Sequence, residues 1–134
     1  MRLIIPLLLI FTAFLVQGQE KAYSGSFEAD SYWTKFEGDW SVSKMDGVWV
    51  VEFSDNFEAK KAPDLKVFFS KLSLDDINGD NAADNSNSVL VGELKTYKGK
   101  VAIAVPGDID PKDYQTIIVH CEKYAKLWGG SSLN

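Results

Sequence analysis

Residues 40–53 read WSVSKMDGVWVVEF, and this stretch decides the fold class. Two strand-like runs flank the pair Asp46-Gly47, and Asp-Gly between such runs is a strong signal for a two-residue β-hairpin turn. The turn also sets the register, because side chains alternate between the two faces of a strand. The pairing predicted outward from the turn places three pairs on one face: Lys44 with Trp49, Val42 with Val51, and Trp40 with Phe53.

The rest of the chain continues in the same pattern of short alternating runs and turns, without a sustained 3.6-residue apolar period. A second hairpin is expected around Lys98-Gly99, with Leu94 opposite Ile103. Further strands are expected at residues 65–69, 116–121 and 124–128, the last ending at Gly129-Gly130. The sequence therefore predicts an all-β domain, an antiparallel β-sandwich or partly closed barrel of about seven or eight short strands.

The N-terminal segment has the composition of a secretory signal peptide. Met1-Arg2 is a short basic start, residues 3–16 are almost entirely apolar, and residues 16–18 offer a cleavage site. The apolar run is shorter than the roughly 20 residues that a transmembrane helix needs. We therefore expect a signal peptide at residues 1–18, an exported domain at residues 19–134, and no stable membrane anchor after cleavage.

Charge and residue counts exclude several functions. The chain has 14 Lys+Arg against 19 Asp+Glu, and its single arginine, Arg2, lies in the expected signal peptide. A negative domain without arginine lacks the basic surface of a nucleic-acid-binding protein. One cysteine and one histidine exclude an internal disulfide, a CxxC pair and a clustered soft-ligand metal site within one chain.

Residues 75–87 form a polar segment rich in carboxylates and amides. Four of them give oxygen ligands at a spacing similar to the start of a calcium-binding loop: Asp76, Asn78, Asp80 and Asp84. However, the twelfth position from Asp76 is Asn87, where such loops place a bidentate acid. Both a calcium site and a solvated connection between strands remain open.

Several anchor residues resemble the DM-thirteen domain family, over about Phe27 to Leu133. The anchors are residues 62–65 and 67–70, Val91, Gly92, Leu94, Gly99, Val105, Pro106, Asp110, Tyr114, Ile117, Val119, Cys121, Tyr124, Trp128, Gly129, Ser131 and Leu133. In the family the residue before the cysteine is usually Trp, whereas here it is His120. The resemblance implies a β-rich fold and an electron-transfer role centred on Cys121. Domains of this family often occur in larger proteins, beside DOMON or cytochrome b561-like domains.

Cys121 is the candidate redox thiol, since a thiol can form a sulfenic acid, form a mixed disulfide with a partner protein, or ligate heme iron. An accessible thiol would also allow a disulfide-linked dimer. In the opposing interpretation, Cys121 serves only as a small apolar side chain that packs in a central strand. His120 is a weak candidate ligand for a bound heme. Neighbouring strand residues point to opposite faces, so His120 and Cys121 are not expected to act as a dyad.

The competing function is a non-catalytic extracellular module that binds carbohydrate or protein. Tryptophans on the surface of an exported β-domain can form a binding platform. Trp40 and Trp49 fall on the apolar face of the first hairpin, which predicts core packing for both. Trp33 is the least constrained of the four tryptophans. No catalytic triad, paired-carboxylate site or phosphate-binding loop is visible, which favours a protein that is not an enzyme.

Overall fold

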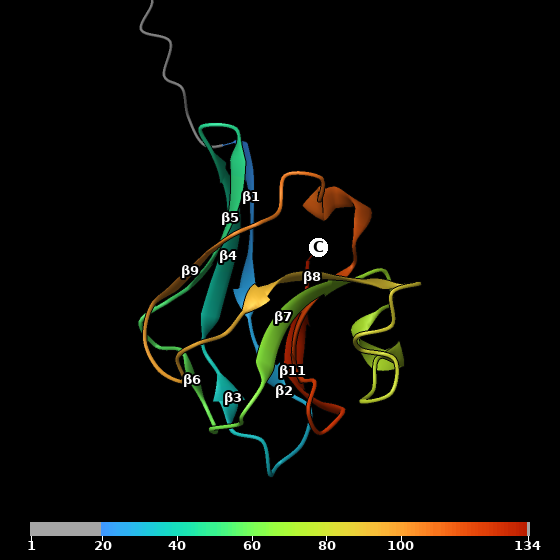
Figure 1. The fold of residues 1–134 in the computed structure, drawn as a ribbon. Helices are drawn as coiled ribbons and strands as arrows, with labels where there is room; N and C mark the ends of the chain where they lie inside the picture. The colour runs from blue at the N-terminus through green and yellow to red at the C-terminus, as the bar shows by residue number, and fades with distance from the viewer. Residues whose placement is uncertain (1–19, 134) are drawn as a thin grey trace, which may run out of the picture.

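The computed structural model describes residues 20–133 and shows an all-β, antiparallel, sandwich-like fold (Figure 1). The strand orders are β1-β4-β5-β9 in one sheet, β2-β11-β10-β7-β8 in the second, and β3-β6 in a small ribbon. The strands are β1 (Glu20–Ser26), β2 (Glu28–Ala29), β3 (Phe36–Glu37), β4 (Asp39–Met45), β5 (Val48–Phe53), β6 (Glu58–Ala59), β7 (Leu65–Ser70), β8 (Ser88–Glu93), β9 (Val101–Ala104), β10 (Thr116–Cys121) and β11 (Lys126–Ser132). The all-β sandwich is confirmed, and the sheets of the described region do not join into a closed barrel.

The first hairpin forms in the predicted register. β4 pairs with β5 from Met45 opposite Val48 to Trp40 opposite Phe53. Asp46 and Gly47 adopt φ values of 50° and 81°, which is the left-handed conformation that a type I′ hairpin turn requires. The face predicted to be apolar packs into the core, where four residues are at most 1% exposed: Trp40, Val42, Val51 and Phe53.

The second expected hairpin is wrong, because its two strands belong to different sheets. β8 pairs with β7, whereas β9 pairs with β5 across the sandwich. The segment between them hydrogen-bonds to a distant part of the chain: the Ala59 N–H donates to the Tyr97 carbonyl (2.8 Å), and the Gly99 N–H donates to the Phe57 carbonyl (2.9 Å). Gly99 still makes a tight turn, with φ 84°, but the turn carries the chain from one sheet to the other.

β10 is the central strand of the second sheet, as predicted, and all six of its residues are buried. Ile117, Val119 and Cys121 face the core between the two sheets. Ile118 faces the other side, where it packs with Phe68 and with the segment at residues 72–83. This segment includes the short 3-10 helix η1 (Leu74–Asp76) and lies beside the second sheet in Figure 1. Both faces of β10 are therefore covered.

The last strand, β11, does not end at Gly129-Gly130 as expected. The strand continues to Ser132, and both glycines lie within it. A Cβ atom at Gly129 would lie 2.3 Å from the Glu28 carbonyl oxygen, and one at Gly130 would lie 2.7 Å from the Ile117 carbonyl oxygen. The two glycines allow the neighbouring backbones to approach closely, so they continue the strand instead of ending it.

The expected signal peptide, residues 1–18, lies outside the described residues. Within residues 20–133, no helix is long and apolar enough to cross a membrane.

The second short helix, η2 (Pro111–Asp113), is of the 3-10 type and precedes β10. Asp110, which immediately precedes this helix, caps it by accepting a hydrogen bond from the Lys112 N–H at 3.1 Å.

Candidate functional site

Cys121 is the last residue of β10, and its side chain is 0% exposed. It pairs with Leu65 of β7 on one side and Lys126 of β11 on the other. The sulfur lies in the apolar core between the sheets. Because a thiolate must contact the disulfide that it attacks, Cys121 cannot react in this closed form. A mixed disulfide or a disulfide-linked dimer therefore needs the end of β10 to open.

His120 lies on the opposite face of the same strand, as the alternation predicted. Its ring is 6.4 Å from that of Phe68, with the planes at 73°, and the residue is 2% exposed. Its Nδ1 atom is buried without a hydrogen-bond partner. His120 and Cys121 therefore occupy separate environments, and they form neither a catalytic dyad nor a joint ligand pair.

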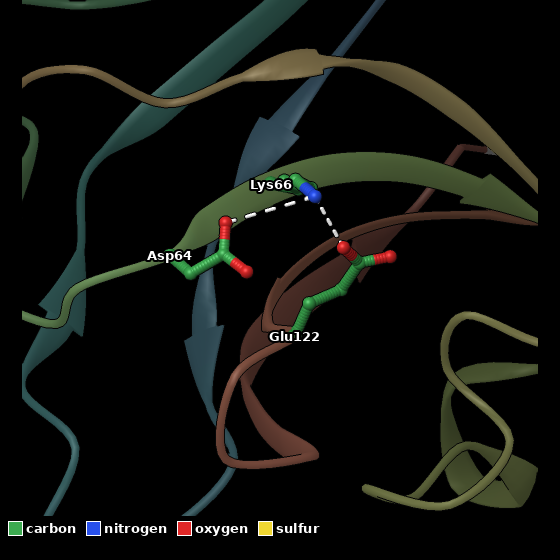
Figure 2. Close-up of polar contacts among 3 residues, drawn as sticks. All are labelled: Asp64, Lys66 and Glu122. Carbon is green, nitrogen blue, oxygen red and sulfur yellow. Dashed lines mark hydrogen bonds and ion pairs between the residues drawn. The ribbon is translucent and has the colours of Figure 1, made fainter.

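Asp64, Lys66 and Glu122 form a small ion network (Figure 2). Lys66 pairs with His120 across the strands, so the network lies on the His120 side of the sheet, at the same end as Cys121. The Lys66 ammonium contacts the Glu122 carboxylate and lies 3.6 Å from the Asp64 carboxylate. The Glu122 N–H also donates to the Asp64 carbonyl at 3.0 Å. Hydrogen bonding to Glu122 raises the pKa of Lys66 above its usual 10.5. These contacts connect the start of β7 to the residue that follows β10.

This network was not predicted from the sequence. Asp64 lies within the anchor residues 62–65, and neither Lys66 nor Glu122 belongs to a recognisable motif. The available signal was alternation: Glu122 lies two positions after His120, so a continued strand direction places both on one face. The pairing of Lys66 with His120 across the strands depends on the tertiary register, which no local pattern gave.

A shallow hollow opens over His120 and brings together residues that are far apart in sequence. Its lining consists of Asp64, Gly79, Asp80, Ala83, Asp84, His120, Glu122, Lys123 and Ala125. Two of the four candidate calcium ligands, Asp80 and Asp84, thus lie near His120. The other two, Asp76 and Asn78, do not line the hollow.

The candidate calcium ligands hydrogen-bond within their own loop. The Asn78 side-chain oxygen accepts from the Asp80 N–H at 2.9 Å, and Asp84 accepts from the Ser86 N–H at 3.0 Å. Asp76 accepts from the Ser73 hydroxyl at 2.9 Å. In residues 20–133, no three His, Cys, Asp or Glu side chains are grouped closely enough to hold a metal ion. The loop geometry is that of a hydrogen-bonded polar connection between strands.

The surroundings of neither candidate ligand fit a heme. Cys121 is fully enclosed by core side chains, which leaves no space beside its sulfur for a macrocycle. The His120 hollow is shallow, and four carboxylates line it. A heme pocket needs an enclosed and mainly apolar slot.

The burial of His120 predicts that the stability of the folded domain depends on pH. Burial lowers its pKa below the usual 6.5, against a smaller opposing effect of Glu122. In the unfolded chain His120 therefore binds a proton below about pH 6.5, whereas in the folded protein burial disfavours the protonated imidazole at the same pH. We expect the free energy of unfolding in urea, followed by tryptophan fluorescence, to fall as the pH drops from 7.5 to 5.5. In His120→Phe this decline should flatten; an identical decline in both proteins would contradict the prediction.

Comparison with known proteins assigns the sequence to one family. No significant match was found among curated proteins or among solved structures. The sequence does match one protein family, described as electron transfer DM13, over residues 26–133. The match covers nearly all of the described fold, from the end of β1 to the end of β11, and includes His120 and Cys121. The chain therefore belongs to the electron transfer DM13 family.

Proposed function

We propose that this protein is an exported accessory domain of an electron-transfer system and that Cys121 is its redox group. The observation that carries the proposal is the family match over residues 26–133, which includes the chain's only thiol. Cys121 is the free thiol of the described region, and a thiol takes part in disulfide exchange without an added cofactor. Export is supported by the basic start and apolar run of residues 1–18.

The burial of Cys121 defines how such a thiol reacts. The residue ends β10, and the turn that follows contains Ala125 in the left-handed conformation, with φ 49°. A strained turn at a strand end is a favourable place for local opening. Once exposed, the Cys121 thiolate attacks an accessible disulfide of a partner protein. A new S–S bond forms, the partner's own S–S bond breaks, and its second sulfur leaves as a thiolate.

Reaction of the domain with oxidised glutathione tests this role. We expect a slow mixed disulfide at Cys121, detected by mass spectrometry and reversed by a dithiol. Its rate should change little at low urea concentration, because local opening exposes little surface. A rate that rises as steeply with urea as global unfolding does would overturn the redox role. The visible spectrum with and without dithionite, which we expect to show no heme band, is the accompanying control.

A second function is supported by the surface of the molecule. Tyr32 and Trp33 are 92% and 73% exposed, whereas the Cys121 thiol is fully buried. Large exposed aromatic groups in a well-packed domain are typical of recognition sites. We infer a non-catalytic module that binds carbohydrate or protein through these two residues. Trp40 and Trp128, by contrast, are 1% and 6% exposed and belong to the core.

A further inference from the structure

The loop between β2 and β3 carries the two most exposed large hydrophobic side chains of the described region, Tyr32 and Trp33. In Figure 1 this loop projects beyond the lower end of the sandwich. The next most exposed member of this group, Tyr124, is 63% exposed and lies elsewhere, after β10. The tip of the β2–β3 loop therefore has the most exposed pair of large apolar side chains in the described region.

The base of this loop is held firmly. Thr34 is 2% exposed, and its hydroxyl lies 3.2 Å from the Trp128 carbonyl of β11 and 3.1 Å from the Ser31 carbonyl. The Asp30 N–H donates to the same Trp128 carbonyl at 3.0 Å. Since the backbone on both sides of the rings is fixed, binding through them requires little ordering of the loop.

The rings of Tyr32 and Trp33 form an edge-to-face pair at the loop tip. The ring centroids are 5.2 Å apart, and the planes of Tyr32 and Trp33 meet at 82°. The exposed aromatic faces of Tyr32 and Trp33 can attract an ammonium or guanidinium group. A neutral sugar ring can also stack on an exposed aromatic face, so the charge beside the rings decides between the two ligands.

The charge beside the rings has the sign that such a cation requires. A shallow hollow adjoins the loop, and its lining includes Glu28, Asp30 and Asp75 but no basic side chain. Asp30 belongs to this hollow and lies two residues before Tyr32 in the chain, which brings a carboxylate close to the aromatic pair. Lys35, two residues after Trp33, is paired with Glu58 at 3.1 Å. Positive groups are attracted to carboxylates and to aromatic faces by the same electrostatics.

We propose that this cation-binding tip, formed by Asp30, Tyr32 and Trp33 together with Glu28 and Asp75, docks a lysine- or arginine-bearing segment of a partner protein. The inference rests on the binding role proposed above and names the chemistry of its partner. It does not involve the Cys121 thiol, so it holds whether or not the redox role is correct.

The test is a titration of the ¹⁵N-labelled protein with a short lysine–glycine peptide, followed by NMR. The amides of residues 30–35 and the Trp33 indole N–H should shift and saturate, and added salt should weaken the binding. The same peptide with acetylated lysines should bind much more weakly. Tyr32→Ala and Trp33→Ala should each reduce affinity about two- to fivefold. Tyr124→Ala, which removes an exposed ring elsewhere, should leave affinity unchanged.

The outcomes of this titration separate the cation assignment from the binding role of the β2–β3 loop. Equal shifts with the lysine peptide and its acetylated form would overturn the cation assignment. Shifts with a neutral oligosaccharide but not with the lysine peptide would also overturn it, while the binding role would survive. If residues 30–35 respond to neither probe, both the cation assignment and the binding role through this loop are wrong. The substituted side chains are exposed, so unchanged thermal unfolding of each variant will show that the fold is intact.

Discussion

Replacing Gly129 by alanine is expected to destabilise the domain by about 3 kcal/mol or more, at the upper end of the usual cost of overpacking a core. The added Cβ would lie 2.3 Å from the Glu28 carbonyl oxygen and 2.5 Å from Cδ1 of Phe36. The carbonyl belongs to the backbone of β2, which pairs with β11 at this point, so it cannot rotate away. Thermal denaturation followed by circular dichroism should show a Tm lower by about 10 °C.

Gly107→Ala is the matched control. A Cβ at Gly107 would meet no atom within 4 Å, and the residue does not need a left-handed backbone. We expect the Tm of this variant to stay the same or rise slightly, because alanine reduces the conformational entropy of the unfolded chain. If both variants had the same Tm as the unaltered protein, the close approach of β2 to β11 would be wrong.

How much of the fold could be predicted depended on whether the pairing partner was local. In residues 40–53 the turn residues and the apolar alternation agree, and both strands lie in one hairpin, so the register was correct. Lys98-Gly99 gave a similar local signal, but the strands on either side pair with β7 and β5 instead. A turn signal predicts that the chain reverses direction, not which strand will supply its hydrogen bonds.

The candidate site shows the same limit. Alternation along β10 was enough to place His120 and Cys121 on opposite faces. It could not show that Asp80 and Asp84 come to lie over His120, because that depends on how residues 72–87 fold back over the sheet. Cys121 had two open interpretations, and only the packing of the opposing sheet shows that it is enclosed.

Native Cys121 is expected to react with iodoacetamide at least about 100-fold more slowly than the same thiol in the urea-unfolded chain. The sulfur is 0% exposed, and each 1.4 kcal/mol of opening free energy lowers the reactive fraction about tenfold. An opening of about 3 kcal/mol already gives the 100-fold difference. Labelling kinetics measured by mass spectrometry will check this, and a native rate within tenfold of the unfolded rate would contradict the enclosed position.

The ion network next to this strand end should contribute to that protection. Lys66, Asp64 and Glu122 join β7 to the residue that follows Cys121, so the contacts that break on local opening include theirs. Glu122→Gln removes the charge and keeps the shape, and the cost of losing a partly exposed ion pair is at most about 1 kcal/mol. The native labelling rate should therefore rise up to about fivefold, whereas Glu52→Gln, on the other sheet, should leave it unchanged. An equal rate in Glu122→Gln and Glu52→Gln would mean that Cys121 becomes exposed by an opening that leaves the network intact.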